Sequence, residues 1–283
     1  HMPALKPPPP PTGAPPAGVP ASSESKQTRT FRPRSGVVVS PQKIGVYGTG
    51  GIGKSSLIPL LKDVGKRPLV LDLDDGSKEL DVDRLTAADG VDSWESMLDA
   101  LKSDELWKPY DVVCIDTCTK AEEYASQWVI EHVPHEKGHF VSRIEDYGFG
   151  KGYTHIYEVF LKLLAELDRH IIAGRDVLIV MHVCTSEAPN PSGDDFLRYE
   201  PRLQNPGKKG QSSVRDRVKE WCDHLLFIGY DVDAKDGKGR GVGMRTIYPQ
   251  ERPTHVAKSR LLSKPIPYLK GDATIWKQLF NKQ

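Results

Sequence analysis

Gly48-Thr49-Gly50-Gly51-Ile52-Gly53-Lys54-Ser55 decides the fold, because it matches G-x-x-x-x-G-K-[S/T] at every fixed position. The apolar run Ile44–Tyr47 before it predicts a short strand, and the sequence from about Lys54 to Val64 predicts a helix. Glycines in such a loop let successive backbone N–H groups turn toward an anion, and the helix N-terminus adds a positive field. The pattern therefore predicts a phosphate-binding loop (P-loop), formed by Gly48, Thr49, Gly50, Gly51, Ile52, Gly53, Lys54, Ser55 and Ser56.

The motif predicts roles for two residues of this loop in binding the phosphates and the metal, and we expect a neighbouring strand to supply a carboxylate for the metal. Lys54 reaches the β- and γ-phosphates, and the Ser55 hydroxyl ligates Mg²⁺. A carboxylate at the end of a nearby strand is needed to hold the metal through water. Asp116, which closes the predicted strand Asp111–Asp116, fits that role. Thr117 follows it and either hydrogen-bonds the attacking water or caps the turn.

Hydrolysis also needs a base or a group that orients water. Three carboxylates, Asp72, Asp74 and Asp75, cluster after the strand predicted at Pro68–Leu73. Alternation along the chain places Asp72 and Asp74 on one face. We expect Asp74 to be the base, with Asp75 as the second choice; a solvated acidic turn is the alternative.

The rest of the chain from Lys43 alternates short apolar runs with helical periodicity. The expected elements are a helix capped by Asp92-x-x-Glu95, a helix from Thr119-x-x-Glu122 to about Val133, a long amphipathic helix through Ile156–Leu167, a strand at Asp176–His182, a helix near Val214–Cys222, and strand-like runs at 224–230, 242–249 and 254–258. Segments 134–152 and 184–213 have loop composition. This order predicts an α/β fold, a mainly parallel sheet flanked by helices, with an antiparallel edge hairpin whose turn is Asp236–Gly239.

The N-terminal segment has a different composition. Its first twenty residues hold nine of the 23 prolines, and such sequence buries too little apolar surface to offset its ordering entropy. We expect a disordered tail over 1–40, in which His1-Met2 has the form of a tag scar, and one folded domain over 41–283.

Composition excludes several classes of protein. With 39 Lys+Arg against 38 Asp+Glu, the net charge of +1 is too small for nucleic acid to be held by bulk charge. No window approaches the roughly 18 apolar residues of a membrane span, so no membrane contact is expected. The histidines at 132, 135 and 139 lack partners at zinc spacing. Reduced thiols in a cytosolic protein are expected for Cys114, Cys118, Cys184 and Cys222.

Several segments together resemble a known family. They are VYGTGGIGKSSL, LVLDLDDGSKELDVDR, SWESML, YDVVCIDT, GFGKGY, VLIVMHV, GRGVGMRTIY and ERPTHVAKSRL. They are similar to phage-encoded AAA-domain ATPases of the RecA-like group, which include single-strand annealing and recombination proteins, and the resemblance covers roughly residues 42–270. It implies a RecA-like fold and a Mg²⁺-dependent, DNA-stimulated ATPase that binds single-stranded DNA. It also implies assembly into a ring or filament, a single-strand-binding protein as a further partner, and the cytoplasm of a phage-infected bacterium as the location.

The resemblance also implies roles for individual residues. Asp74 occupies the position of the family's catalytic Glu, and its side chain is one methylene shorter than that Glu. His182 occupies the position of a γ-phosphate sensor. Lys258 and Arg260 correspond to cations that reach the neighbouring subunit's ATP site. DNA is expected at the loops 134–152 and 184–213, the second of which carries Arg198, Arg202, Lys208 and Lys209. The alternatives are a P-loop kinase acting on a small molecule and a nucleotide-dependent scaffold protein.

Overall fold

The computed structural model describes residues 31–207, 212–235 and 238–280, in two units divided after Val38. Residues 31–38, the described part of the first unit, are exposed and contain no helix or strand. The helices and strands of the described residues lie in the second unit. The division falls near the predicted boundary at residue 40, and most of the predicted tail lies outside the described residues.

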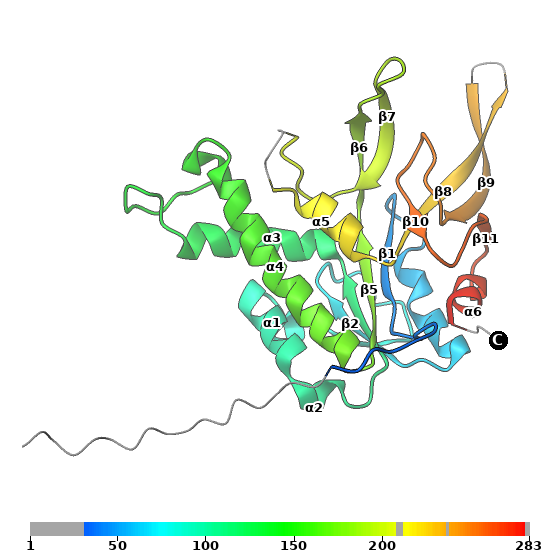
Figure 1. Ribbon diagram of the computed structural model, residues 1–283, viewed down its shortest axis with the longest axis horizontal. Helices are drawn as coiled ribbons and strands as arrows, with labels where there is room; N and C mark the ends of the chain where they lie inside the picture. The colour runs from blue at the N-terminus through cyan, green and yellow to red at the C-terminus, as the bar shows by residue number, and fades with distance from the viewer. Residues whose placement is uncertain (1–30, 208–211, 236–237, 281–283) are drawn as a thin grey trace, which may run out of the picture. The chain divides into compact units, whose positions relative to one another are not determined.

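The second unit is built on one large sheet (Figure 1). Within the described residues its strands follow the order β11-β9-β8-β1-β5-β4-β2-β3, with β10 paired to β8. Neighbours from β8 to β3 along this order are parallel, whereas β9, β10 and β11 pair antiparallel. The strands are β1 Lys43–Gly48, β2 Pro68–Asp72, β3 Asp83–Leu85, β4 Val112–Asp116, β5 Asp176–Met181, β8 His224–Lys235, β9 Lys238–Tyr248, β10 Lys258–Ser259 and β11 Ile266–Tyr268. The predicted α/β class, parallel centre and edge hairpin are confirmed; Asp236 and Gly237 of the predicted turn lie outside the described residues.

Both faces of the sheet are covered. Side chains on one face, such as Tyr47 and Ile115, pack with helices α1–α5; those on the other, such as Val46 and Cys114, pack with η1, η2 and α6. Strands buried on both sides are apolar throughout, which is why PLVLD and VVCID show no alternation. The helices are α1 Trp94–Lys102, α2 Asp104–Trp107, α3 Cys118–His132, α4 Lys151–Ile172, α5 Val214–Trp221 and α6 Thr274–Phe280, with 3₁₀ turns η1 Ser55–Leu57, η2 Pro59–Val64, η3 Ala87–Asp89 and η4 Ile144–Tyr147.

The helix predicted from Lys54 to Val64 is wrong in type, since two 3₁₀ turns replace it. The N–H groups of Leu57 and Ile58 bond three residues back, and Pro59 has no N–H to offer the Ser55 carbonyl for an α-helical bond. The cap of α1 also differs from the prediction. Ser93 accepts the Ser96 N–H, so the cap lies one residue later than Asp92.

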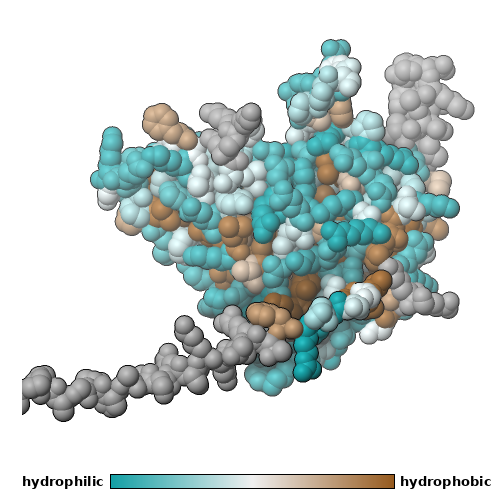
Figure 2. Space-filling view, viewed as in Figure 1, coloured by the Kyte–Doolittle hydropathy of each residue, from teal (hydrophilic) through white to brown (hydrophobic). Residues whose placement is uncertain are grey.

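The two predicted loops contain regular structure. In 184–213, β6 Val183–Ala188 and β7 Phe196–Pro201 form a separate antiparallel hairpin, drawn as a mainly hydrophilic projection in Figure 2. In 134–152, η4 precedes the start of α4 at Lys151. Both segments were predicted to be loops because few of their positions are buried, so their sequences show no apolar stripe. No helix in the described ranges is long and apolar enough to cross a bilayer.

Candidate functional site

The P-loop lies at the carboxyl end of β1, which has a parallel neighbour on each side, β5 and β8. Two of its glycines are required by geometry. At Gly53 the backbone has φ +100°, and a Cβ would come within 2.6 Å of the Arg245 guanidinium. At Gly48 a Cβ would lie 2.5 Å from the Ile228 carbonyl oxygen of the neighbouring strand. The motif glycines thus allow both the turn and the close packing of the loop on β8.

Lys54 is held inside this loop. Its Nζ donates to the carbonyl oxygens of Gly48 and Thr49, at 2.9 and 2.8 Å, and the residue is 7% exposed. Burial lowers the pKa of Lys54, and the nearby charges of Asp116 and Asp74 act against that shift. The ammonium is therefore placed at the mouth of the loop, where it can exchange carbonyl partners for phosphate oxygens.

Asp116 is a buried carboxylate beside the P-loop serine. It ends β4, is 3% exposed, and lies near enough to Ser55 for the serine hydroxyl to lower its pKa. Its Oδ2 has no hydrogen-bond partner among the described residues. Burial raises the pKa of Asp116, the Ser55 hydroxyl and Lys54 lower it, and the charges of Asp72 and Asp74 raise it further.

This pair fits a Mg²⁺ site of the P-loop kind. A buried carboxylate oxygen without a partner is costly unless a cation or water satisfies it. The described residues contain no group of three or more His, Cys, Asp or Glu arranged around a metal. Mg²⁺ commonly takes one or two protein oxygens and completes its shell with water and phosphate. Ser55 and Asp116 therefore suit Mg²⁺ that arrives with a nucleotide.

Asp74 is brought to the same edge by the sheet register. Asp72 of β2 pairs with Asp116 of β4, which pairs with Val180 of β5, so these three strands end together. The Thr117 hydroxyl donates to Asp74 Oδ2 at 2.6 Å, and His182 Nε2 lies 3.2 Å from the same oxygen. The carboxylate is thus fixed by groups from two neighbouring strand ends. Thr117 Oγ1 also accepts the Lys120 N–H, so this residue does cap the following helix.

The other two acidic residues of the cluster face elsewhere. Asp72 is 1% exposed and accepts hydrogen bonds from the N–H groups of Gly76 and Ser77 and from the Ser77 hydroxyl, so it shapes the turn after β2. Asp75 is exposed, has φ +57°, and pairs with Lys78 at 2.5 Å. The geometry therefore favours Asp74 over Asp75 as the group that faces the phosphate edge.

Lys258 and Arg260 are not brought to this chain's own P-loop. Lys258 pairs with Leu225, near the start of β8, whereas Gly48 pairs with Ile228. Three residues along a strand separate these positions by about 10 Å. The Lys258 ammonium donates instead to the Glu220 carbonyl at 3.1 Å.

Two residues that the sequence analysis did not single out hold the P-loop from the C-terminal side. Arg245 Nη1 donates to the Ile52 carbonyl at 2.9 Å, and the Tyr268 hydroxyl donates to the Gly53 carbonyl at 2.8 Å. The Arg245 guanidinium also lies over the Tyr268 ring, 4.6 Å from its centroid. We call Arg245 and Tyr268 the P-loop clamp. In the sequence, the one signal for Arg245 is that it lies in the segment GRGVGMRTIY, which is part of the family resemblance; no signal indicates Tyr268.

The predicted DNA-contacting residues are dispersed. Arg198 forms ion pairs with Glu200 and Glu251, at 3.1 and 2.8 Å, so these carboxylates already neutralise the charge that DNA phosphates would need. Arg202 is exposed, and its N–H donates to the His182 carbonyl at 2.8 Å, which connects the hairpin to the phosphate edge. Lys208 and Lys209 lie outside the described residues.

Comparison with known proteins agrees with this geometry. Residues 40–261 match the profile of AAA_24, described as an AAA domain. The chain belongs to this family of AAA domains. It is thus a nucleotide-binding P-loop ATPase domain, and the predicted RecA-like P-loop fold is confirmed. Among solved structures it is similar to the KaiC-like protein PH0186 from Pyrococcus horikoshii OT3, at 12% identity, with 81% of this chain and 85% of that chain covered and a TM-score of 0.43. No curated protein matches the chain.

Proposed function

We propose that this AAA domain hydrolyses ATP with Mg²⁺, assembles with copies of itself, and binds single-stranded DNA to promote annealing or recombination. The observation that carries the ATPase part of this proposal is the convergence of Lys54, Asp116 and the Asp74–His182 pair on one edge of the sheet. Each of these groups suits one part of phosphoryl transfer to water.

In this mechanism the protein mainly positions charge. Lys54 leaves the two loop carbonyls and binds β- and γ-phosphate oxygens. The Ser55 hydroxyl and, through water, Asp116 would hold Mg²⁺ that arrives with the nucleotide, and the ion would supply neutralisation of the phosphate charge. Asp74 accepts the proton of the attacking water, because its carboxylate is held in place by Thr117 and His182.

Support for DNA binding comes from the position of the β6–β7 hairpin. It follows His182 directly, is mainly hydrophilic, and is tied back to His182 by the Arg202 N–H. A change at the γ-phosphate edge therefore has a short covalent and hydrogen-bonded route to a polar surface. We propose that DNA contacts on this side change with the nucleotide state.

The test is ATP turnover with and without single-stranded DNA, with Lys54→Ala as the inactive reference. We expect DNA to raise turnover in the wild type, and affinity for DNA to fall as salt rises. If the rate of ATP turnover is the same with and without DNA, the DNA proposal is contradicted and the scaffold alternative is favoured. ATP consumption that requires a small-molecule acceptor supports the kinase alternative instead.

A further inference from the structure

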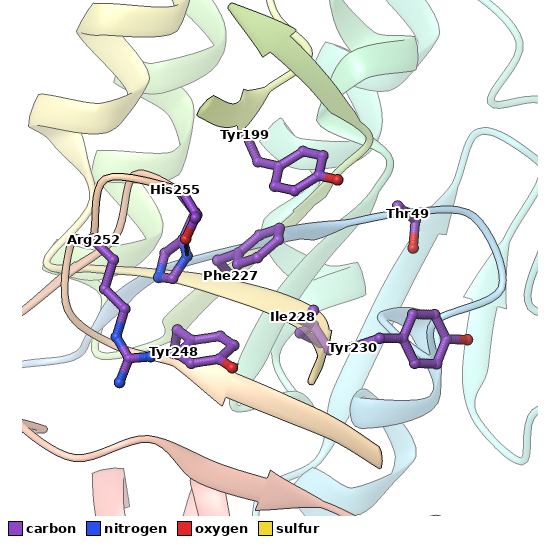
Figure 3. Close-up of a pocket in the computed structure, with 10 residues that line it drawn as sticks. Thr49, Tyr199, Phe227, Ile228, Tyr230, Tyr248, Arg252 and His255 are labelled. Atoms are coloured by element: carbon purple, nitrogen blue, oxygen red, sulfur yellow. Dashed lines mark hydrogen bonds between the residues drawn. The ribbon is translucent and has the colours of Figure 1, made fainter. Parts of the chain in front are cut away.

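An aromatic pocket of about 340 Å³ lies beside the P-loop residue Thr49, between β7, the middle of β8, the carboxyl end of β9 and the segment 252–255 (Figure 3). Its floor is Phe227, which is 5% exposed. Tyr199 and His255 stack on Phe227 with centroid separations of 5.4 and 4.7 Å and interplanar angles of 18° and 24°. Tyr248 lies beside them, 4.7 Å from His255. Nothing in the ATPase mechanism above uses these rings.

The pocket is held in shape by hydrogen bonds from its neighbouring strands and segments. Tyr199 exchanges backbone hydrogen bonds with Thr254 and Val256. The Tyr248 hydroxyl donates to Asp231 at 2.6 Å. Burial lowers the pKa of His255 to about 4, so its imidazole, 2% exposed, is neutral near pH 7 and packs behind the pocket as an uncharged ring. The rings therefore form a preformed stacking surface, of which Tyr199 is 40% exposed.

One cation stands at the rim of this pocket. Arg252 is exposed, and its guanidinium lies 4.8 Å from the centroid of the Tyr248 ring. Within the described part of the chain, Arg252 has no carboxylate at ion-pair distance, in contrast to Arg198. An accessible guanidinium next to stacked rings is suited to a phosphate attached to a planar base.

We propose that the aromatic pocket binds one unstacked base of single-stranded DNA, with Arg252 on an adjoining phosphate. The inference rests on the proposed DNA binding and names the surface that performs it. A strand fits better than a free nucleotide, because the pocket offers ring faces and a single cation but lacks the run of backbone donors that the P-loop provides for several phosphates. Its volume is at the small end for ligand pockets, which suits one base rather than a pair.

The pocket also touches the ATP site. Thr49 belongs to both, and Tyr199 lies three residues before Arg202, whose N–H bonds to the His182 carbonyl. A nucleotide that draws Lys54 away from the Thr49 carbonyl therefore changes the border of the pocket. We expect a base to be held more tightly in one nucleotide state than in the other.

Binding of labelled oligo(dT) tests the proposal in the full chain. Tyr199→Ala is expected to weaken binding about tenfold, because a stacking contact is lost, whereas Tyr199→Phe keeps the wild-type affinity. Arg252→Gln is expected to weaken binding and to reduce the salt slope by about one phosphate contact. The controls Ile172→Ala and Arg217→Gln, an exposed apolar residue and an exposed cation that lie outside the pocket and outside both predicted DNA loops, should bind as the wild type does.

A second arm locates the base directly. An oligonucleotide that carries 4-thiothymine should crosslink on irradiation to peptides that contain Tyr199 or Tyr248, and an abasic site at that position should remove the effect of Tyr199→Ala. Crosslinks confined to 134–152, or wild-type affinity in both Tyr199→Ala and Arg252→Gln, overturn the pocket while DNA binding stands. Absence of any binding to oligo(dT) overturns the function and the pocket together. Displacement of the crosslink by dTMP in the Lys54→Ala variant assigns the pocket to a free nucleotide and contradicts the proposal.

Should Tyr199→Ala not fold, as judged by thermal unfolding, the outcome is decided by Arg252→Gln, whose side chain is exposed, and by the crosslinked peptides in the wild type.

Discussion

Asp74 and Asp75 are neighbours in sequence, yet the structure gives them different surroundings. Asp74 meets Thr117 and His182 at the phosphate edge, while Asp75 turns outward to Lys78. We therefore expect Asp74→Asn to lower the rate of ATP hydrolysis at least about 100-fold, since a general base commonly contributes that much. Nucleotide affinity should remain near that of the wild type.

The matched control for this prediction is Asp75→Asn. It should hydrolyse ATP at the wild-type rate, because its carboxylate faces solvent and a lysine. Single-turnover hydrolysis measured beside binding of a fluorescent ATP analogue separates the two effects. A normal rate for Asp74→Asn with a slow one for Asp75→Asn would show that the base is assigned one residue too early.

Glu122 on α3 gives a prediction on the pH dependence of stability. Burial raises the pKa of Glu122 to about 7. The hydrogen bond that Glu122 accepts from the Gln204 N–H and the charge of Arg215 both lower this pKa. In the unfolded chain a Glu titrates near 4.5. The folded state therefore binds the proton more tightly, and its stability falls as pH rises from about 4.5 to about 7. For this half-buried group the loss is on the order of 2 kcal/mol.

Glu122→Gln should remove that slope, because an amide cannot ionise but can still accept one hydrogen bond from Gln204. The free energy of unfolding, measured in urea at pH 5.5 and pH 8, is expected to differ less in the variant than in the wild type. Glu123→Gln, an exposed neighbour, is the control and should keep the wild-type difference. An equal slope in wild type and Glu122→Gln would show that another group carries the pH dependence.

At the scale of elements, the P-loop depends on two residues that lie 193 and 215 positions from their partners in the loop. Tyr268→Phe removes one hydrogen bond to the Gly53 carbonyl, and Arg245→Gln removes the donor to Ile52 and the cation over the Tyr268 ring. Each lost hydrogen bond is worth about 1 kcal/mol. We expect both variants to fold with a slightly lower melting temperature and to raise the KM for ATP several-fold.

The control for the clamp is Tyr230→Phe, on the same sheet edge but without a hydrogen bond to the loop among the described contacts. Thermal unfolding together with steady-state kinetics would check the pair. Unchanged KM in both clamp variants would mean that the loop keeps its shape without them.

The sequence predicted the parallel sheet and the phosphate edge because the signals for both are local. Ile44–Tyr47 with the glycine loop, and the apolar run closed by Asp116, are each recognisable within a few residues. The β6–β7 hairpin was missed because its strands are mostly polar, and its buried Glu200 is stabilised by Arg215 and Lys219 rather than by apolar packing. The clamp was missed because nothing near Arg245 in sequence indicates a contact with Ile52.

At the scale of the whole molecule, the described residues of one protomer bring no second cation into contact with the Lys54–Asp116 edge. Lys54 is the P-loop cation, and Lys258 and Arg260 lie toward the far end of β8 from their own P-loop. Charge that develops on the transferred phosphoryl group is commonly stabilised by a further cation, often from a neighbour. We therefore expect the active ATPase to be an assembly in which Lys258 and Arg260 complete the site of the adjacent copy.

Mixing two inactive variants tests this arrangement. Lys54→Ala protomers have no working P-loop but keep Lys258 and Arg260, whereas Lys258→Ala/Arg260→Ala protomers keep the P-loop and lack both cations. At an interface between the two kinds, an intact P-loop meets intact cations, so turnover should return to roughly a quarter to a half of the wild-type rate at equal mixing, depending on how freely the protomers exchange. Light scattering and differently labelled protomers would verify that mixed assemblies form. If mixed assemblies stay inactive, or if a strictly monomeric protein is fully active, these cations do not act across the interface. Each protomer must then stabilise the phosphoryl charge with its own residues, and Arg245, which already contacts the P-loop at Ile52, is the first to test.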